Sequence, residues 1–288
     1  MKLKFPKSPT TSWVIRTKNE EIWFGEVLKT LFMQSRLDFE VIIVDSGSKD
    51  NTLQIAKDFP VRKIINVPEK DFNFSYALNL GIKESWGKYI GIISGHSFPV
   101  SRTWYQNAME NFADPKMAAV TGHYTAFPDG SLDEKLGDLY FDFKRLEKKF
   151  YCKWMTNTNA IVRKDLWEKY PFDERLEECE DYDWACEMIT RGWNIVKDPK
   201  FNVYHSHGGI GRPTYNDRVP TWRRVCALID KKTDRVNHIR SCLKKFFKNF
   251  CVFLHSFLRR LSANLNFAFA ALPAEHFGSA QCKAPYVP

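Results

Sequence analysis

Paired cysteines are missing from this sequence. It has seven cysteines, an odd number, and no two of them stand in a C-x-x-C spacing. Disulfide-stabilised secreted domains and structural zinc modules both depend on paired cysteines. Neither class is indicated, and a reducing cytoplasm is the compartment that we expect.

Targeting and membrane-spanning segments are missing as well. The first nine residues are basic, but no apolar stretch follows them, so that no ordinary secretory signal is predicted. No segment runs for about 18 residues without a charged side chain, and a spanning helix needs about that length. We therefore expect a protein that is neither exported nor integral to a membrane.

The formal net charge is +9, but almost all of this excess of basic residues lies in one segment. Between residues 231 and 261, nine basic side chains stand against one acidic side chain, a net charge of +8, which leaves +1 for the rest of the chain. A nucleic-acid-binding protein needs basic residues across the surface of its fold. We therefore expect no nucleic-acid partner.

What the sequence does contain is an alternation of apolar strands and helical segments. Strands are first predicted over 12–17, 39–44, 61–67 and 89–93, with helices over 22–33, 53–58 and 75–85 between them. Further on, the pattern predicts helices over 104–112, 164–170 and 182–191 and strands over 118–124, 194–196 and 201–204. This order is typical of an α/β fold with a mostly parallel central sheet flanked by helices, in which ligands bind at the carboxyl ends of the strands.

Glycine-rich phosphate loops are absent, since neither G-x-G-x-x-G nor G-x-x-x-x-G-K-[ST] occurs. Two other polar segments follow predicted strands, Asp45-Ser-Gly-Ser48 and Ser94-Gly-His-Ser97. Asp45 can accept hydrogen bonds from a nucleobase or ribose, or it can cap a turn, and the residues leave both alternatives open. His96 is a metal ligand or a phosphate contact if other ligands converge on the same edge, and a loop histidine if they do not.

Two later segments also carry functional groups. Acidic side chains crowd residues 173–183, ahead of a helix whose first turn favours them because they complement the helix dipole. That explanation covers most of these acids, though not evidently all of them. The strand at 201–204 leads into His205-Ser-His207 and then Gly208-Gly-Ile-Gly211, a composition suited to a mobile lid.

In this order the segments resemble the family-2 glycosyltransferases of the GT-A fold, inverting enzymes that take a sugar from a nucleotide diphosphate. The resemblance covers roughly residues 12–207 and implies a Rossmann-like GT-A domain. It rests on Val14-Ile-Arg-Thr-Lys-Asn-Glu20, Val41-Ile-Ile-Val-Asp-Ser-Gly-Ser-Lys-Asp-Asn-Thr52, Ala77-Leu-Asn-Leu-Gly81, Gly87-Lys-Tyr-Ile90, and Glu180-Asp181 ahead of Arg191-Gly192. Together with Tyr204-His-Ser-His207, the pattern is most similar to bacterial transferases of surface polysaccharide assembly, including rhamnosyltransferase-like members.

The resemblance implies a role for each matching residue. Asp181 becomes the catalytic base with Glu180 beside it, and Arg212 belongs to the lid. The acceptor lies near Thr156, Asn157 and Asn159. The residues implied in binding the donor nucleotide are Thr17, Glu20, Asp45, Ser46, Gly47, Asn79, Ser94 and Gly95.

The sequence departs from the family at its metal motif. The usual Asp-x-Asp is replaced by Ser94-Gly95-His96, which lacks the first carboxylate. Mg²⁺ prefers oxygen ligands, whereas imidazole suits Mn²⁺ and later transition metals. Two alternatives stay open: His96 with His207 or His205 holds Mn²⁺ or Mg²⁺ together with the donor phosphates, or His96, Arg212 and a helix N-terminus neutralise the diphosphate without metal.

The implied reaction is an in-line displacement that moves a sugar from a nucleotide-diphosphate sugar to a hydroxyl of a saccharide acceptor, in the synthesis of cell-surface polysaccharide. Asp181 takes the proton from that hydroxyl, and the configuration inverts. The alternative is a non-catalytic sugar-nucleotide-binding subunit of a glycosyltransferase complex. The missing aspartate favours this alternative, while Asp45, Asp181 and the histidines oppose it.

The chain is expected to divide into a catalytic domain, residues 1–230, and an appendage, residues 231–288. From Leu243 to Leu265 apolar residues recur at helical spacing, with basic residues mainly on the other side. Such a helix is typical of an anchor on an anionic membrane surface, or it packs on the catalytic body or in a homodimer interface. We expect peripheral attachment to the inner face of the cytoplasmic membrane, beside a lipid-linked acceptor.

Overall fold

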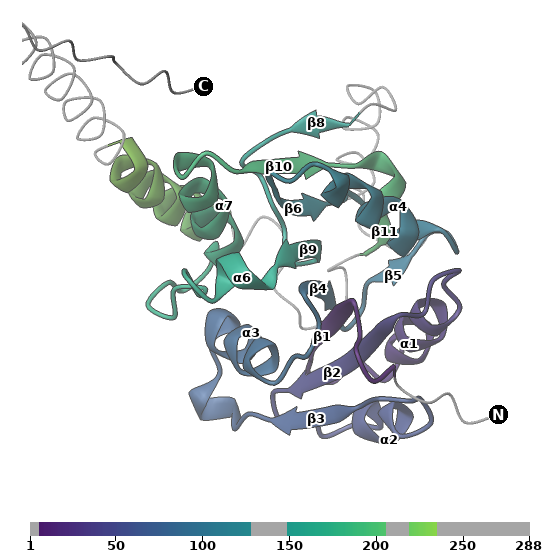
Figure 1. Ribbon diagram of the computed structural model, residues 1–288. Helices are drawn as coiled ribbons and strands as arrows, with labels where there is room; N and C mark the ends of the chain where they lie inside the picture. The colour runs from purple at the N-terminus through teal and green to yellow at the C-terminus, as the bar shows by residue number, and fades with distance from the viewer. Residues whose placement is uncertain (1–5, 128–148, 206–218, 235–288) are drawn as a thin grey trace, which may run out of the picture. The chain divides into compact units, whose positions relative to one another are not determined.

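The computed structural model describes residues 6–127, 149–205 and 219–234. The chain begins with β1 (Thr11–Thr17), α1 (Phe24–Phe32), β2 (Phe39–Asp45), α2 (Thr52–Ala56), β3 (Lys63–Asn66), α3 (Phe74–Lys83) and β4 (Tyr89–Ser94) (Figure 1). It continues with β5 (Phe98–Pro99), α4 (Trp104–Glu110), β6 (Met117–Thr121), β7 (Tyr124–Thr125), β8 (Phe150–Tyr151), β9 (Asn159–Arg163), α6 (Lys164–Trp167), α7 (Glu180–Thr190), β10 (Asn194–Lys197) and β11 (Val203–Tyr204). Residues 219–234 form a further helix.

The main sheet of the described residues has the strand order β3-β2-β1-β4-β9-β6-β10-β8. The four strands β3, β2, β1 and β4 are parallel, and β6 is parallel to β10. Between these two parts, β9 runs antiparallel to both β4 and β6. The predicted mostly parallel α/β sheet is therefore confirmed, with one antiparallel strand at its centre.

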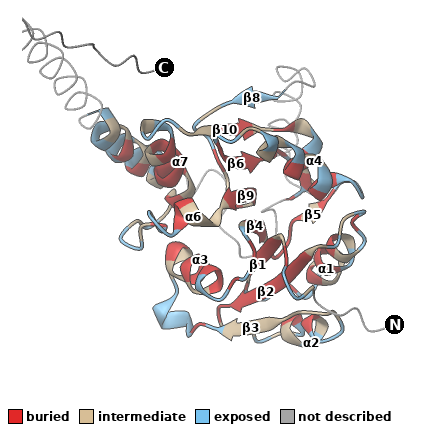
Figure 2. Cartoon of the chain, in the orientation of Figure 1, coloured by how far each residue is buried: buried red, intermediate tan, exposed pale blue. Residues whose placement is uncertain are grey.

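Helices cover both faces of this sheet, and the side chains of β1 alternate between them. Trp13 and Ile15 belong to a core shared with α1, α2 and α4, whereas Val14 belongs to a second core shared with α3, α6 and α7. Figure 2 shows the central strands buried along their length. A strand covered on both faces needs apolar residues at successive positions, which is why these strands appear in the sequence as continuous apolar runs.

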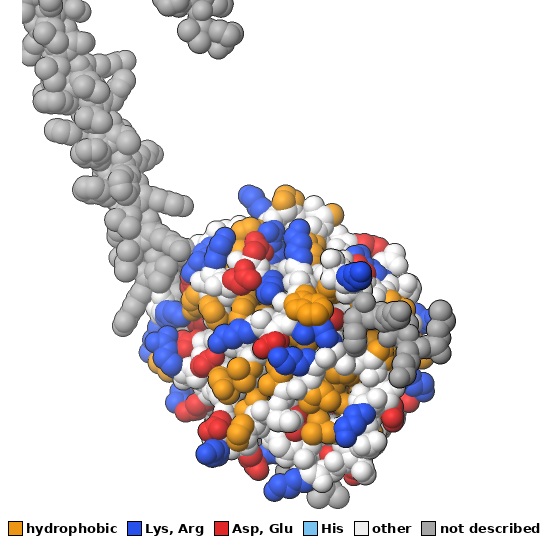
Figure 3. Space-filling view, turned by 60° about the horizontal axis from the view of Figure 1, so that its bottom comes forward, with side chains coloured by type: hydrophobic (Ala, Val, Ile, Leu, Met, Phe, Trp, Pro, Cys, Tyr) orange, Lys and Arg blue, Asp and Glu red, His pale blue; other side chains and the backbone are white. Residues whose placement is uncertain are grey.

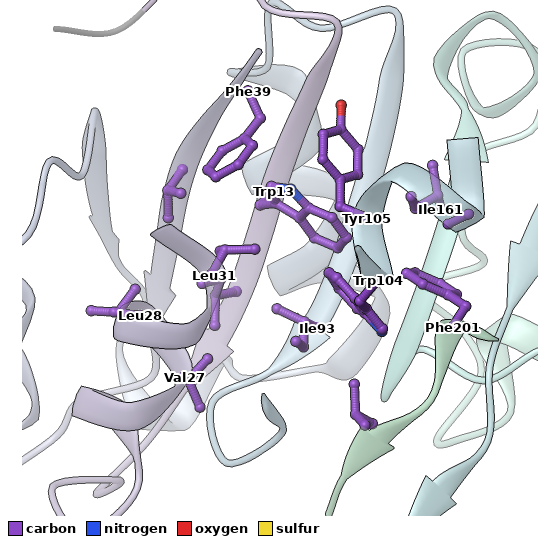
Figure 4. Close-up of a cluster of buried hydrophobic side chains, with 14 of the residues drawn as sticks. Trp13, Val27, Leu28, Leu31, Phe39, Ile93, Trp104, Tyr105, Ile161 and Phe201 are labelled. Atoms are coloured by element: carbon purple, nitrogen blue, oxygen red, sulfur yellow. The ribbon is translucent and has the colours of Figure 1, made fainter. Parts of the chain in front are cut away.

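An aromatic cluster fixes α4 and the chain before β11 against β1 (Figure 4). The Trp13 ring stacks on Trp104 with centroids 4.9 Å apart, and Trp104 stacks on Phe201 at 4.4 Å. Tyr105 meets Trp13 edge-on, and its hydroxyl donates to Oγ1 of Thr11 at 2.8 Å. Aromatic pairs of this kind contribute roughly 0.5–1.5 kcal/mol each beyond the area that they bury.

The strand predicted over 118–124 is wrong in one respect, because the structure divides it. β6 ends at Thr121 in the main sheet, and β7 begins at Tyr124 in a second sheet of order β5-β11-β7. Gly122 lies at the break, where a Cβ atom would stand 1.7 Å from the carbonyl oxygen of Phe201. The close passage of the chain around Phe201 therefore ends the first strand at this glycine.

The chain divides into two compact units, Met1–Thr233 and Asp234–Pro288, and the described residues belong almost entirely to the first. In this unit the helix over 219–234 places Val225 and Ile229 against Tyr182 and Cys186 of α7. None of the described helices combines the length and apolar character that crossing a bilayer requires. The domain division at residue 230 stays a prediction, and the amphipathic segment from Leu243 to Leu265 lies outside the described residues.

Candidate active site

The carboxyl ends of β1, β2 and β4 meet at one edge of the sheet. In the strand register Thr17 lies opposite Asp45, and Arg16 lies opposite Ser94. The segments that follow β2 and β4 therefore start side by side, on the edge where ligands bind in open α/β sheets. The structure brings these sequence-predicted donor residues together.

The contact between the ends of β1 and β4 depends on Gly95. Its backbone N–H donates to the carbonyl oxygen of Arg16 at 3.0 Å, and a Cβ atom at this position would stand 2.9 Å from that oxygen and 3.0 Å from Oγ1 of Thr17. The Thr17 hydroxyl is buried and has no hydrogen-bond partner among the described residues. A buried hydroxyl without a protein partner is uncommon.

His96 lies directly beyond β4 and is held by a carboxylate. Its Nδ1 donates to Oε1 of Glu20 at 2.8 Å, and both side chains are buried. His205, just past β11, is held in a similar way by a hydrogen bond of 2.7 Å between its Nδ1 and the hydroxyl of Ser97. The two imidazole rings stack with centroids 4.6 Å apart and planes inclined by 24°. Predicted donor and metal residues thus form one buried cluster.

The stacked rings do not fit a shared metal ion. A metal ion lies in the plane of each imidazole that binds it, about 2.0–2.1 Å from the nitrogen. Two planes inclined by 24° at this separation do not meet close to the rings. Among the described residues, moreover, no group of three or more His, Cys, Asp and Glu side chains is placed to hold a metal ion. His207, the third predicted ligand, and the lid residue Arg212 lie outside the described residues.

The Asp45 carboxylate is engaged by its own turn. The backbone N–H groups of Gly47 and Ser48 each donate to Oδ2 at 2.9 Å, and the Ser48 hydroxyl donates to Oδ1 at 2.5 Å. Gly47 adopts φ = +84°, a conformation that glycine tolerates and other residues rarely adopt. Ser46 is buried beneath the turn. The structure thus contains the capping turn that the sequence allowed, while the contact of Asp45 to a nucleoside stays a prediction.

Two predicted asparagines connect segments of the fold. Asn79 donates through Nδ2 to the carbonyl oxygen of Phe172 at 2.9 Å and to Glu174 at 2.8 Å, and its Oδ1 accepts from the indole of Trp167 at 3.0 Å. The Nδ2 of Asn159 donates to the carbonyl oxygen of Phe201. Both asparagines are buried, so the donor role predicted for Asn79 and the acceptor role predicted for Asn159 gain no support from their contacts.

The predicted base Asp181 and its neighbour Glu180 lie in the first turn of α7. Asn157 contacts both, because its backbone N–H donates to Oδ2 of Asp181 at 3.0 Å and its Nδ2 donates to Oε1 of Glu180 at 3.1 Å. Although part of Asp181 remains exposed, burial of its carboxyl group raises its pKa to about 7, and the negative charge of Glu180 adds to the shift. The structure therefore unites three predicted residues around a carboxyl group that titrates near neutrality.

Unusual backbone conformations occur directly before Glu20 and directly before Glu180. Among the described residues other than glycine, Asn19 and Cys179 adopt positive φ values, of 52° and 67°. Each precedes a glutamate of the candidate site, Glu20 or Glu180. Such conformations cost of order 1–3 kcal/mol and concentrate at functional sites, where the surrounding structure maintains them.

Arg16 and Ser97 were not among the predicted site residues. Nη1 of Arg16 lies 3.7 Å from Oε1 of Glu180, and the Ser97 hydroxyl holds His205. Arg16 belongs to a segment that carries the family resemblance, and it follows Val14 by two residues on the same face of β1. This position in the motif could have identified Arg16 as a site residue. Nothing in the sequence, by contrast, pairs Ser97 with a residue 108 positions away.

Comparison with known proteins places these features in a family. The model of Glycosyl transferase family 2 matches residues 12–170. The O-antigen chain rhamnosyltransferase RfbN of Salmonella typhimurium is 27% identical over 213 residues, which cover 70% of this chain and 68% of RfbN. The dolichyl N-acetyl-alpha-D-glucosaminyl phosphate 3-beta-D-2,3-diacetamido-2,3-dideoxy-beta-D-glucuronosyltransferase of Methanococcus voltae is 29% identical over 225 residues, which cover 69% of this chain and 68% of that protein.

A solved structure supports the fold independently. The mannosyltransferase PcManGT from Pyrobaculum calidifontis, in complex with GDP-Man and Mn²⁺, matches with a TM-score of 0.58 at 21% identity, over 73% of this chain and 61% of that chain. The chain thus spans about two thirds of the length of these three relatives. The predicted GT-A fold is confirmed by this similarity. Because the family model covers more than half of the chain, the resemblance read from the motifs is confirmed as well, and the chain belongs to glycosyl transferase family 2.

Proposed function

We propose that the protein is an inverting glycosyltransferase that moves a sugar from a nucleotide-diphosphate sugar to a hydroxyl of a saccharide acceptor in cell-surface polysaccharide synthesis. The observation that carries this proposal is the carboxyl group of Asp181, held by Asn157 and titrating near pH 7. A general base works best when its pKa lies near the operating pH. The O-antigen chain rhamnosyltransferase RfbN, as a relative, supports the polysaccharide assignment.

In the proposed mechanism the oxygen of the acceptor hydroxyl attacks the anomeric carbon of the donor sugar, and Asp181 accepts the proton of that hydroxyl. The nucleoside diphosphate leaves from the opposite face, and the configuration inverts in one displacement. A diphosphate needs no carboxylic acid to depart, so a single carboxylate suffices, unlike the pair in glycosidases.

On the donor side we propose that the nucleotide lies against the ends of β1, β2 and β4. Thr17 offers its buried hydroxyl, and Glu20 orients His96 toward the diphosphate. A carboxylate on Nδ1 fixes the orientation of the ring, which suits a defined contact to phosphate oxygens. No step is assigned to a metal ion, because the stacked rings of His96 and His205 do not fit a shared one.

For the acceptor we propose a lipid-linked saccharide at the inner face of the cytoplasmic membrane. Two observations support this assignment. One relative has a name that specifies a dolichyl-linked sugar phosphate. The sequence from residue 231 to 261 carries a net charge of +8, which would attract an anionic membrane surface.

The experiment that tests the proposal is the substitution Asp181→Asn. We expect transfer to fall by roughly two to four orders of magnitude, the usual contribution of a general base. Binding of the donor should stay within about twofold, since a neutral amide of equal size leaves the donor pocket in place. Transfer is measured as release of nucleoside diphosphate from UDP-, GDP- and dTDP-sugars with polyprenyl-linked saccharides as acceptor, and donor binding is measured by calorimetry.

Asp183→Asn is the matched control. Asp183 lies one half-turn further along α7, is buried, and pairs with Lys232 at 3.0 Å and with the Tyr170 hydroxyl at 2.9 Å. We expect this variant to lose stability and to keep most of its transfer rate. Normal turnover of Asp181→Asn would exclude Asp181 as the base. Binding of a nucleotide sugar without any transfer by the unmodified protein would favour the non-catalytic subunit instead.

A further inference from the structure

Arg16 connects the sheet edge with the carboxyl pair on α7. It is the last residue but one of β1, and its backbone pairs with Val44 on one side and Ser94 on the other. Side chains alternate along a strand, so Arg16 projects from the same face as Val14, the face that α3 and α7 cover. A guanidinium group on this face is unusual because the neighbouring positions of the strand are apolar.

Contacts with three groups of the described residues fix the Arg16 side chain, which is only 17% exposed. Its Nη1 donates to the carbonyl oxygen of Phe74 at 3.2 Å, and its Cζ lies 4.8 Å from the centroid of the Phe74 ring. The same Nη1 lies 3.7 Å from Oε1 of Glu180. The start of α3 thus holds the guanidinium group in place, and the group faces the carboxylate beside the proposed base.

The contacts continue from Glu180 to Asp181 through one residue. The oxygen that faces Arg16, Oε1 of Glu180, also accepts from Nδ2 of Asn157 at 3.1 Å. The backbone N–H of Asn157 donates to Asp181 at 3.0 Å. Arg16, Glu180, Asn157 and Asp181 therefore form a continuous chain of polar contacts from β1 to the base.

Charge explains why this chain matters. Two adjacent carboxylates repel each other, and burial disfavours the ionised form of a carboxyl group. Burial and Glu180 raise the pKa of Asp181, whereas Arg16 lowers it. Among the described residues the thiols of Cys179 and Cys226 also interact with Asp181, and burial raises the pKa of both, so that they stay neutral. Arg16 is a cation that the structure places beside the pair.

We propose that Arg16 is a positioning residue for the transfer reaction. Its positive charge neutralises Glu180 and thereby keeps Asp181 ionised and oriented toward the acceptor. This inference rests on the proposed role of Asp181 as base. It assigns to Arg16 no contact with the substrate, and so separates this arginine from the residues that bind the donor.

The test compares Arg16→Gln and Arg16→Lys with the unmodified protein over pH 5–9. For Arg16→Gln we expect the acidic limb of kcat/KM to move to higher pH by about one unit, which is a tenfold loss of rate at pH 6 that disappears near pH 9. Arg16→Lys keeps the charge and should restore most of the rate. Calorimetric affinity for the donor should stay within about twofold in both variants.

Arg163→Gln is the matched control. Arg163 has the same three kinds of partner, a carboxylate on Asp165 at 3.0 Å, the carbonyl oxygen of Pro115 at 3.2 Å, and the Trp193 ring at 5.0 Å. It lies opposite Tyr89, at the other end of β4 from the candidate site. We expect Arg163→Gln to leave the pH profile unchanged. An equal loss of rate at every pH in Arg16→Gln, or weaker donor binding, would overturn the inference.

A second measurement keeps the inference testable even if no transfer is found. The difference in melting temperature between Asp181→Asn and its parent grows from about pH 3.8 upwards, and the pH at which it stops growing reports the folded-state pKa of Asp181 without any substrate. In the Arg16→Gln background this upper limit should move to a higher pH by about one unit. An unmoved upper limit would refute the role of Arg16, whereas absent transfer with a moved upper limit would refute only the proposed function.

Discussion

A carboxyl group with a raised pKa destabilises the folded protein at neutral pH, and Asp181 is such a group. In an unfolded chain its pKa lies near the ordinary value of 3.8, and in the fold it is raised to about 7. Between these values the folded protein binds a proton that the unfolded chain has released. Stability is therefore lost as the pH rises through this window.

Asp181→Asn removes this loss, because the amide stays neutral at every pH. We expect the variant to melt roughly 8–16 °C above the unmodified protein at pH 8, and at nearly the same temperature near pH 4. Differential scanning calorimetry at both values checks the prediction. Equal melting temperatures at pH 8 would mean that Asp181 carries no raised pKa. Asp183→Asn, which breaks the pair with Lys232, should instead lower the melting temperature at both pH values.

The pair Glu20 and His96 is expected to act as one unit in donor binding. Their hydrogen bond is 2.8 Å long and buried. A substitution of either residue removes this bond, and with it the orientation of the imidazole ring. We expect Glu20→Gln and His96→Asn each to weaken nucleotide binding. The loss of binding free energy in the double variant should be smaller than the sum of the two single losses, by a coupling of about 1 kcal/mol. Calorimetry with UDP, GDP and dTDP, each with Mn²⁺ and with EDTA, measures the cycle. Strictly additive losses would contradict a joint role.

At the residue scale the sequence predicted which segments meet, but not how their side chains pair. Asp45 and Ser94 were predicted from motifs and strand ends, and they lie at the sheet edge expected. Asp181 was predicted from a motif and lies in the first turn of α7. The contact of Glu20 with His96 spans 76 positions, and that of Ser97 with His205 spans 108. Such pairings depend on the rotation of each side chain at the ends of strands, which no periodicity encodes.

At the scale of elements, local pattern predicted the parallel part of the sheet well. The strands expected over 12–17, 39–44 and 89–93 differ from β1, β2 and β4 by at most one residue at each end. These strands are buried on both faces, so their apolar runs are long and clearly bounded. The direction of β9 was not predictable, because the apolar run from Ala160 to Val162 would serve a parallel or an antiparallel strand equally.

The break between β6 and β7 gives the prediction for this scale. Gly122→Ala places a methyl group against the Phe201 carbonyl and the Asn159 amide, both buried, so the chain has to move. We expect a loss of about 3 kcal/mol or more, seen as a melting temperature lower by roughly 6–12 °C. Gly25→Ala in α1 is the control, because its Cβ would meet its nearest atom at 3.7 Å, an ordinary contact, and alanine favours the helix. Equal melting temperatures of the two variants would contradict the packing argument.

At the scale of the whole molecule, the charge is divided between two parts of the chain. The body is nearly neutral, and on the face that Figure 3 shows, basic and acidic side chains are interspersed with apolar ones. The excess of +8 belongs to residues 231–261, where the sequence predicts an amphipathic helix. Since the family and the enzyme class follow from residues 12–170, this second part needs its own explanation. Attraction to an anionic membrane supplies one, because each basic residue near such a surface contributes about 1 kcal/mol.

The prediction is that the affinity for lipid depends on where the charge lies and not on how much there is. Replacement of Lys244, Lys245 and Lys248 by glutamine in the full chain should reduce co-sedimentation with phosphatidylserine vesicles by roughly a hundredfold in partition coefficient. The same change of charge at three exposed lysines of the body, Lys57, Lys83 and Lys200, should leave it within about threefold. Phosphatidylcholine vesicles should bind neither variant nor the unmodified protein well. An equal loss in the two triple variants would mean that net charge alone governs binding. Binding to vesicles would then give no support to a lipid-linked acceptor at the membrane surface.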